Sequence, residues 1–267
     1  MRPSRLVFAV VLPLAFLITW DEPARDALPA HRPGHARPEA ARTAPRPDIV
    51  SRRTWRANEE LVREPASSTH GVRAVFIHHT NQPNDYACSD VPRMLRTLEE
   101  DHVRRGWDDL GYNFVVDRCG TVYEGRAGGA HRSVEGAHTK GFNEHSLGIA
   151  ALGTFDEGKK VPHAMLESIA ALAAWKLEAG ADPHGRTRMV SSSSESRFEK
   201  GSAAMFEVIS GHRDAYATSC PGKALYGKLP EIRDAVARMR THAGVRQPKP
   251  LATEAGRGHR GRTRPRH

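Results

Sequence analysis

The residues best suited to chemistry in this chain are a histidine and a cysteine in a polar segment of its C-terminal quarter. His212 and Cys220 lie eight residues apart within Ile209–Gly222, and Pro221 and Gly222 directly follow the thiol. In a helix, residues eight apart would be separated by about 12 Å along the axis, too far to share one ion. A loop can bring the two together, and one imidazole with one thiolate makes half of a tetrahedral zinc site.

A third ligand is expected from an apolar run far upstream. Val75–Thr80 is rich in β-branched and aromatic residues and contains two adjacent histidines, His78 and His79. Two His and one Cys, with the fourth position left for water, are typical of a catalytic rather than a structural zinc. The alternative is chance, because the chain contains 15 histidines and pairs near apolar runs can arise without a function.

The charge of the chain is concentrated at its ends. The 267 residues carry a net charge of +9 and have a mean hydropathy of −0.57, which indicates polar tails around an ordinary core. Residues 241–267 hold six Arg and one Lys against one Glu, and residues 1–50 hold seven Arg against five acids, which leaves +1 for residues 51–240. The basic balance therefore belongs mainly to the tail, and the folded part is not expected to bind nucleic acid.

The N-terminal segment predicts export from the cytoplasm. Arg2 and Arg5 precede an apolar run, Leu6–Trp20, of 15 residues, which is short for a membrane span. Residues 1–20 are therefore interpreted as a signal peptide, or as an uncleaved N-terminal anchor because no clear cleavage site follows. Residues 21–48 are rich in Pro and Ala without apolar periodicity, which predicts a linker.

Residues 49–240 alternate between strand and helix patterns. Short apolar runs predict strands, and helices are expected where Pro92 and Pro162 open segments with apolar residues three and four apart. The Ser-, Gly- and Arg-rich residues 181–204 are expected to form an exposed excursion. The strands are expected at 73–77, 114–116, 121–123, 146–153 and 208–209, and the helices at 92–105, 162–179 and 223–239.

This alternation predicts the fold class α/β. We expect a single domain with a mixed central β-sheet and helices on both faces. His78 and His79 follow a strand at its C-terminal end, where active sites commonly lie in α/β sheets.

Three cysteines in an exported chain predict one disulfide and one unpaired thiol. If Cys220 binds metal, the pair is Cys88–Cys119, and closing that loop contributes about 3–4 kcal/mol in the chain-entropy model. The alternative is that Cys220 is an unpaired core cysteine. Its neighbours, Ser219 and Pro221 in a polar loop, argue against burial in a core.

Six motifs in order carry a resemblance to a known family over approximately residues 50–240. Together they resemble the zinc-dependent N-acetylmuramoyl-L-alanine amidases that share a fold with peptidoglycan recognition proteins and phage T7 lysozyme, and indicate a bacterial, exported member. A single motif is weak, whereas six in the correct order are specific. The motifs are Phe76–Thr80, Gly106–Phe114, Gly120–Arg126, Gly136–Thr139, Ser146–Ala150 and Gly211–Gly222.

The resemblance implies a ligand set and two catalytic residues. His78, His212 and Cys220 match the zinc ligands of the family, which implies one Zn²⁺ per chain. Tyr112 matches its active-site tyrosine. Thr218 matches a position held by Lys in the phage enzyme and by Thr or Ser in animal amidases.

The resemblance also implies a groove for glycan and peptide. Its expected substrate-binding residues are His79, Thr80, Trp107, His138 and Asn143. For His79 the alternative is a role in packing, or a hydrogen bond that supports one of the metal ligands. For Trp107 the alternative is a core aromatic residue.

Members of the family hydrolyse the amide between the lactyl group of N-acetylmuramic acid and L-alanine in peptidoglycan, a reaction of the EC 3.5.1.28 type. An amide is a poor electrophile, and zinc can polarise its carbonyl and lower the pKa of bound water towards about 7. Tyr112 suits a neutral donor to the oxyanion. The donor to the leaving amine stays unassigned, because no Glu accompanies the ligands.

Two other interpretations remain open at this point. A non-catalytic peptidoglycan-recognition module is one, although such members typically lack a ligand and all three positions are filled here. The other is a cationic binder whose Arg-rich residues 241–267 adhere to anionic wall polymers or phospholipid headgroups, against the plainer interpretation of a solvated, disordered end. We expect a secreted, cell-wall-associated monomer whose partner is the muramyl peptide stem.

Overall fold

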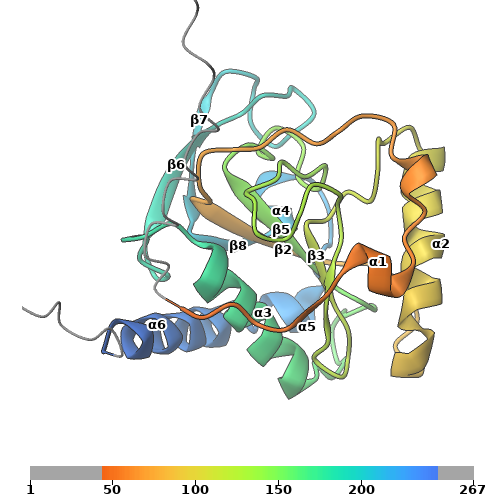
Figure 1. Cartoon of the computed structure of the whole chain (residues 1–267). Coiled ribbons are helices and arrows are strands. Elements are labelled where there is room, and N and C mark those ends of the chain that lie inside the picture. The colour runs from red at the N-terminus through yellow and green to blue at the C-terminus, as the bar shows by residue number, and fades with distance from the viewer. Residues whose placement is uncertain (1–43, 246–267) are drawn as a thin grey trace, which may run out of the picture. The chain divides into compact units, whose positions relative to one another are not determined.

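The computed structural model describes residues 44–245, which form one α/β domain (Figure 1). The expected export signal, most of the expected linker and the Arg-rich residues from 246 onward lie outside the described residues. Within the described part of the chain, none of the helices is both long and apolar enough to span a membrane.

A six-stranded mixed sheet forms the centre of the domain, as predicted. The strand order is β1-β4-β3-β5-β2-β8, in which β3 and β4 pair antiparallel and all other neighbours pair parallel. The two longest strands of this sheet, β2 and β5, are neighbours in its interior and are buried along their whole length, which explains their continuous apolar sequences. The strands are β1 (Ile49–Val50), β2 (Ala74–His79), β3 (Phe114–Val116), β4 (Val122–Glu124), β5 (Ser146–Ala151) and β8 (Ile209–Gly211).

Two long helices cover one face of this sheet. Helices α3 (His163–Lys176) and α6 (Leu229–Val245) pack against each other below the strands in Figure 1. Residues on alternate positions of the central strands, such as Ile77 and Ile149, face these helices in the largest core cluster. The period-two alternation of the strands thus fills this side of the sheet with apolar side chains.

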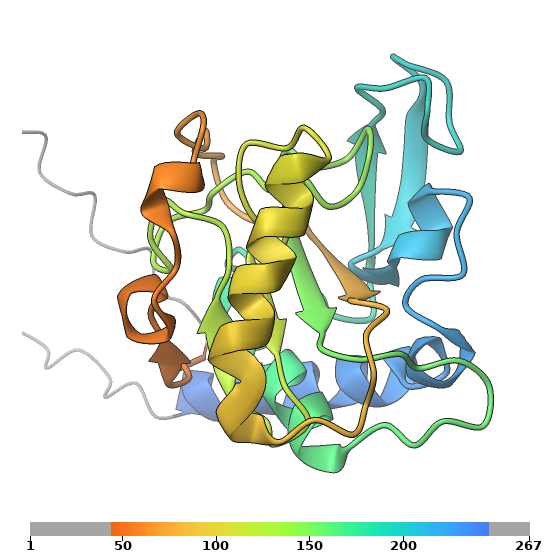
Figure 2. The ribbon, with the colours of Figure 1, turned by 90° about the vertical axis from the view of Figure 1, so that its right-hand side faces the viewer.

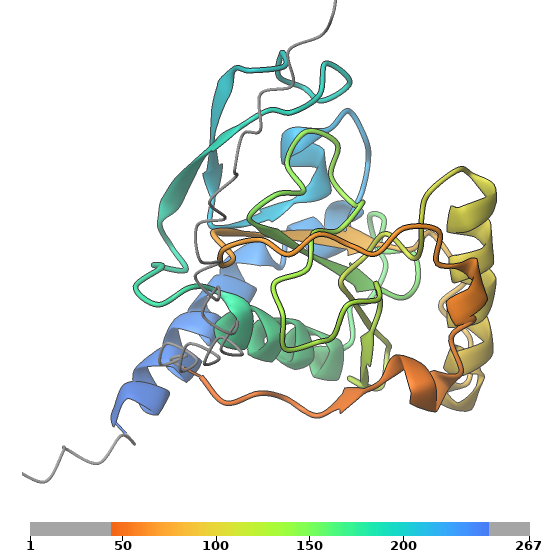
Figure 3. The same ribbon diagram turned by 45° about the horizontal axis from the view of Figure 1, so that its top comes forward.

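The opposite face is covered by different elements at its two ends. Helix α2 (Val91–Arg104), with α1 (Arg52–Trp55), packs over one end through Trp55, Leu95 and Val115. A second sheet, β6 (Arg186–Val190) with β7 (Ala203–Glu207), packs over the other end (Figures 1 and 3). The prediction of helices on both faces is therefore confirmed.

The expectation for residues 181–204 is wrong in part. They were expected to form an exposed excursion, but they contain β6 and the first two residues of β7, which pair as an antiparallel hairpin. Met189 and Phe206 are buried on its inner side, where Phe206 packs edge-on to Phe76 of β2 at 5.3 Å between ring centroids. Because alternate residues of both strands point to solvent, the segment looks polar in sequence although it covers one end of the sheet.

The predicted hairpin and disulfide are both present. Strands β3 and β4 pair antiparallel, and the carboxylate of Asp117 accepts hydrogen bonds from the backbone N–H groups of Cys119 and Thr121 in the turn. Cys88 and Cys119 form a disulfide with 6.5 Å between their Cα atoms, and Cys220 is unpaired. The bond ties this turn to the short 3₁₀ turn Cys88–Asp90 that precedes α2.

The last predicted helix is divided in two. A single helix was expected over 223–239, but α5 (Lys223–Tyr226) stops at Gly227 before α6 begins at Leu229. Helix α6 then continues to Val245. The guanidinium of Arg240 donates hydrogen bonds to the carbonyl oxygens of Ala174 and Leu177 at the end of α3, which holds the two long helices together.

Candidate metal centre

His78 lies near the C-terminal end of β2, between the parallel neighbours β5 and β8. It follows Phe76 on the same face of the strand, so its side chain projects on the side of α2 and the β6–β7 hairpin. The residue is completely buried. A central strand therefore fixes this histidine more firmly than a surface loop would.

His212 is brought beside His78 by the edge strand β8. Gly211, the last residue of β8, is opposite Ile77 in the register, so His212 leaves the sheet next to the end of β2. His212 begins α4 (His212–Ala215), a single turn in which the Asp214 carboxylate accepts a hydrogen bond from the Gly211 N–H at 2.8 Å. This turn points the imidazole back over the sheet.

Cys220 returns to the same place at the end of the following loop. The Arg213 N–H donates to the Cys220 carbonyl at 3.0 Å, and the Thr218 hydroxyl accepts from the Cys220 N–H at 3.2 Å. The thiol itself accepts a hydrogen bond from the His79 N–H at 3.3 Å. Although its neighbours in sequence are polar, Cys220 is only 7% exposed, because the loop folds this residue inward.

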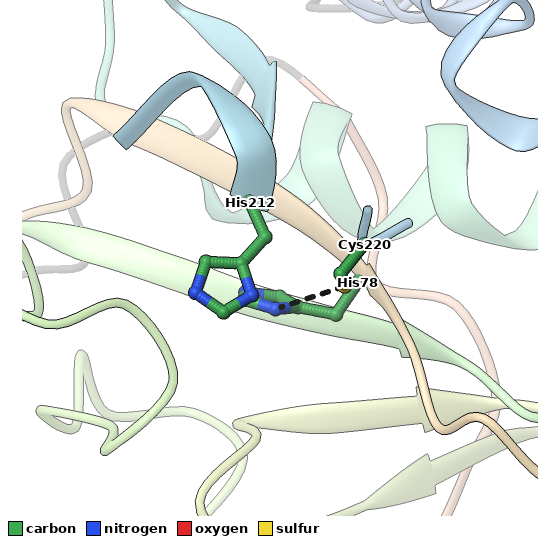
Figure 4. A group of neighbouring side chains, drawn as sticks. All are labelled: His78, His212 and Cys220. Carbon is green, nitrogen blue, oxygen red and sulfur yellow. Dashed lines mark hydrogen bonds between the residues drawn. The ribbon is translucent and has the colours of Figure 1, made fainter. Parts of the chain in front are cut away.

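The three side chains form a compact cluster (Figure 4). One ligand atom from each of His78, His212 and Cys220 lies within 4.8 Å of the other two. The thiol sulfur is 3.8 Å from Nδ1 of His78, and the two imidazole centroids are 4.5 Å apart. Among residues 44–245, the only other such group is Asp117 with the two disulfide cysteines, whose sulfurs are bonded to each other.

A pocket of about 290 Å³ opens beside this cluster. Trp107, His138 and Asn143, three of the residues expected to bind substrate, lie on its wall together with His212. The sequence interpretation missed three further wall residues, which are Ala137, Lys140 and Tyr216. Tyr216 stacks on His212 with 5.4 Å between ring centroids. Its position four residues after His212, a metal-ligand candidate, is the sequence signal that could have identified it as a site residue.

A sequence model of the family described as N-acetylmuramoyl-L-alanine amidase matches residues 68–223, more than half of the chain and all of the cluster. The chain belongs to this family. Relatives include proteins named for recognition of peptidoglycan and proteins named for the amidase reaction. The fold expected from the sequence is that of this peptidoglycan-related family.

Three relatives illustrate the range of sequence identity and coverage. Peptidoglycan-recognition protein 1 of Holotrichia diomphalia is 30% identical over 72% of this chain and 84% of its own length. The N-acetylmuramoyl-L-alanine amidase of Sus scrofa is 35% identical over 58% of this chain but only 22% of its own length. Peptidoglycan-recognition protein 2 of Holotrichia diomphalia is 36% identical over 41% of this chain and 56% of its own length, so the chain spans about half of that relative.

Solved structures agree on the fold. Drosophila peptidoglycan recognition protein SA superposes with a TM-score of 0.53 at 23% identity, covering 69% of this chain and 91% of that one. The α/β architecture predicted from the sequence is thereby confirmed.

In this amidase-family chain, two residues support the far side of His78. Nε2 of His78 is 3.2 Å from Nδ1 of His138 and 3.4 Å from the hydroxyl of Thr139. If Nδ1 of His78, which faces the thiol, is the atom that takes a metal ion, Nε2 carries the proton and these two groups are placed to accept it. Thr139 was missed as a site residue, although it follows His138 directly.

His138 is held in place by backbone and glycine contacts. The Asn143 side-chain carbonyl accepts hydrogen bonds from the N–H groups of His138 and Thr139, at 3.0 and 2.8 Å. The His138 ring lies directly on β5 at Gly148, where an added Cβ would be 2.4 Å from the ring. Only glycine therefore permits this imidazole to reach His78 across the strand.

His79 and Thr80 differ from the expectation, because neither lies among the residues that line this pocket. The alternation of β2 turns His79 to the opposite face from His78, where Nδ1 accepts a hydrogen bond from the Phe155 N–H at 3.4 Å. The Thr80 hydroxyl accepts from the Gly153 N–H at 2.9 Å. Thr218 holds the Cys220 loop, as described above. These residues brace the centre rather than form the wall of the pocket.

Tyr112 lies beside the ligand cluster. Its ring is 5.2 Å from the His78 ring and 5.4 Å from that of His102, measured between centroids. Burial, reinforced by the nearby Cys220, raises the pKa of the Tyr112 hydroxyl. The hydroxyl therefore stays protonated, as a hydrogen-bond donor must, over the whole physiological range.

The electrostatics of the cluster favour neutral imidazoles. Burial, helped by His212 and His138, lowers the pKa of His78 well below its usual value. Burial also lowers the pKa of His212 to about 4 and that of His138 to about 3. Neutral imidazole is the form that binds a metal ion, so metal binding near pH 7 does not require these histidines to lose a proton.

For the Cys220 thiol, burial disfavours the form that binds a metal ion, which is the thiolate. Burial raises the pKa of Cys220 to about 12, against the hydrogen bond from the His79 N–H, which lowers it. A bound divalent cation reverses this preference, because its charge deprotonates a coordinating thiol. Two neutral imidazoles and one such thiol are nitrogen and sulfur donors that suit zinc. The residues present therefore fit the ion expected from the sequence.

Proposed function

We propose that this chain is a zinc-dependent amidase that cleaves the bond between N-acetylmuramic acid and L-alanine in peptidoglycan. The observation that carries the proposal is the convergence of His78, His212 and Cys220, all within 4.8 Å, at the edge of a substrate-sized pocket. Family membership supplies the substrate class. The expected export signal supports action outside the cytoplasm, at the cell wall.

In this proposal the three ligands hold one zinc ion per chain. A zinc ion held there supplies the Lewis acidity and water activation that amide hydrolysis requires. His138 and Thr139 fix the tautomer and orientation of His78 through the contacts of 3.2 and 3.4 Å at Nε2. Thr218 holds the backbone of Cys220 and thereby the position of the thiol.

The pocket walls and Tyr112 would then act on the substrate. Trp107 packs against His102 at 4.4 Å between ring centroids and presents an aromatic surface suited to a sugar or peptide face. Lys140 and Asn143 add polar groups on the same wall. Tyr112 donates its hydroxyl proton as a hydrogen bond to the oxyanion that develops on the scissile carbonyl.

The test is digestion of purified peptidoglycan by the full-length protein. We expect stem peptides with new L-alanine amino termini and intact glycan strands. New reducing ends would indicate a glycosidase, and new termini within the stem would indicate a peptidase. Either result would contradict the proposed bond.

Variants separate the enzyme from a recognition module. Cys220→Ala should remove both the metal and the activity, because it deletes a ligand and the charge that holds the cation. His184→Ala, at an exposed histidine that pairs with Asp234, is the matched control and should retain both. Wild-type protein that binds peptidoglycan without stoichiometric zinc and releases no L-alanine termini would establish the recognition module instead.

A further inference from the structure

A cavity larger than the pocket beside His212 lies away from the metal centre. It measures about 590 Å³ and shares no lining residue with the pocket beside His212. Three cationic side chains, Arg118, Lys159 and Lys160, line it together with an apolar floor of Leu152 and Phe155. We call this cavity the basic pocket. Its lining residues come from the loops that follow β2, β3 and β5 and from the start of α3. Figure 2 shows the course of these loops beside the sheet.

The frame of the basic pocket is tightly connected. The Tyr86 hydroxyl accepts a hydrogen bond from the Arg118 N–H at 2.7 Å and donates to the Leu152 carbonyl at 3.1 Å. The Asn84 side chain bonds to both the N–H and the carbonyl of Thr154, each at 2.7 Å. With the Cys88–Cys119 disulfide, these contacts join all three loops, so the cavity is a built feature rather than a gap between loose loops.

The charge around this cavity is uncompensated. No carboxylate lines it, and within residues 44–245 no carboxylate forms an ion pair with Arg118, Lys159 or Lys160. Of the acids nearby in sequence, Glu157 pairs with Lys223 at 2.5 Å, and Glu167 lies 3.5 Å from His163. The Asp117 carboxylate accepts hydrogen bonds from the Cys119 N–H and the Tyr123 hydroxyl. Helix α3 begins at this wall, so its N-terminal end adds potential of the same sign to that of the side chains.

We propose that the basic pocket binds a polyol-phosphate chain, an anionic polymer of repeating phosphodiesters. The Arg118 guanidinium donates from Nη1 to the Asn84 carbonyl at 3.1 Å, and its remaining N–H groups can hydrogen-bond one phosphate. Lys159 and Lys160 can act as point charges for the next phosphate. Leu152, Phe155 and Tyr86 give the carbon units between the phosphates an apolar surface. The volume lies in the range of ligand sites that hold several units, whereas a single small anion would leave most of it empty.

This site would anchor a phosphate-bearing wall polymer while the separate pocket beside His212 remains open. The two functions are independent, because none of the three cations belongs to the metal centre or its pocket. Loss of polymer binding should therefore leave the chemistry at the metal unchanged.

Lysine footprinting of the full-length protein tests the proposal. An amine acylating reagent is applied with and without poly(glycerol phosphate), and the modified lysines are counted by mass spectrometry. Lys159 and Lys160 should be protected, while Lys200, which is exposed on the β6–β7 loop, should not. Free glycerol phosphate at the same phosphate concentration should protect them far less, since it cannot bridge the cations. Equal protection by the monomer would reduce the site to a simple phosphate site and overturn the polymer assignment.

A charge-matched pair of variants gives the second readout. The pocket variant Arg118→Gln/Lys159→Gln/Lys160→Gln should bind the polymer about tenfold more weakly at low salt. The control Arg186→Gln/Arg188→Gln/Lys200→Gln removes the same charge from the β6–β7 hairpin and its loop and should change binding less than about twofold. Both variants should hydrolyse a soluble muramyl peptide like the wild type. Equal losses of binding in both variants would mean that only net charge matters, and the basic pocket would not be a site.

Discussion

At the scale of single residues, the two adjacent histidines of β2 show what a sequence can and cannot decide. Both were predicted to lie in the site, because their residue type and their place at a strand end are visible in the sequence. Strand alternation sends His78 to the ligand cluster and His79 to the Phe155 N–H on the other face. Which histidine joins the ligand cluster depends on the pairing of β2 with the rest of the sheet, and the motif alone does not contain that information.

Tyr112 gives the sharpest test of the mechanism at this scale. Tyr112→Phe removes only the hydroxyl, so zinc should remain bound while turnover falls by about 10²–10³-fold, the cost typical of one lost oxyanion donor. Zinc content and the rate of L-alanine release measure the two effects separately. Tyr123→Phe, which removes a hydroxyl bonded to Asp117 at 3.0 Å in the hairpin, is the control and should keep the wild-type rate. A wild-type rate for Tyr112→Phe would make this residue only a wall of the site.

His102 provides a pH-dependent test. Burial is the main cause that lowers the pKa of His102 from 6.5 to about 4, and the neutral ring accepts a hydrogen bond from the Gly111 N–H at 3.0 Å. Since the unfolded chain binds this proton more tightly, the neutral form stabilises the fold above pH 6.5, and that stability is lost as the pH falls towards 4. Protonation of His102 should therefore lower the free energy of unfolding by about 2 kcal/mol when the pH falls from 7.5 to 5.

The comparison with His102→Gln isolates this effect. Glutamine retains an acceptor for the Gly111 N–H but does not titrate. Urea unfolding at the two pH values should show a smaller loss for the variant than for the wild type, by about 2 kcal/mol. All other ionisable groups are the same in both proteins, so their contributions cancel. Parallel losses in the two proteins would contradict the lowered pKa.

At the scale of elements, strands and helices with strong apolar patterns were predicted well. The strand at β2, the β3–β4 hairpin and the helices α2 and α3 all follow from buried runs and proline starts. The β6–β7 hairpin was missed because only alternate positions, such as Ala204 and Phe206, are buried, and because the connection between its strands contains the Ser-rich stretch 191–196. The division between α5 and α6 coincides with Gly227, a helix-ending signal that the apolar periodicity concealed.

The Cys88–Cys119 disulfide joins two of these elements and carries a stability prediction. The double variant Cys88→Ser/Cys119→Ser frees a loop closed over a sequence separation of 31 residues. In the chain-entropy model, its free energy of unfolding should be lower by about 3–4 kcal/mol. Denaturant unfolding measures this loss, and wild-type protein reduced before unfolding should match the variant. A loss below about 1 kcal/mol would mean that the chain-entropy term does not dominate here.

At the scale of the whole molecule, sequence reasoning predicted the ligand types but only part of the pocket wall beside them. His78, His212 and Cys220 come from segments more than 130 residues apart in the chain, and their meeting was predicted from motif order rather than from geometry. Lys140 and Tyr216 line the pocket only because their loops fold over the sheet. The basic pocket is likewise assembled from three loops, so the low net charge of residues 51–240 concealed a local concentration of cations.

The Arg-rich tail gives the final prediction. Helix α6 ends at Val245, so a truncation that preserves the helix removes residues 246–267, with six Arg and one Lys against one Glu. If the tail attracts anionic wall polymers, the truncated protein should adsorb to isolated cell walls at least about tenfold more weakly at low salt. High salt should abolish the difference, since it screens exposed charges within a few ångströms.

Two controls distinguish attraction by the tail from binding in the folded domain. Replacing the six tail arginines by lysine keeps the charge and should preserve adsorption, as measured by sedimentation with the walls. Hydrolysis of a soluble muramyl peptide should be the same for the full-length and truncated proteins, because the metal centre and its pocket lie within residues 78–220. Unchanged adsorption after truncation would show that the tail is only a solvated end. Wall attachment would then depend on the folded domain, through the basic pocket or the pocket beside His212.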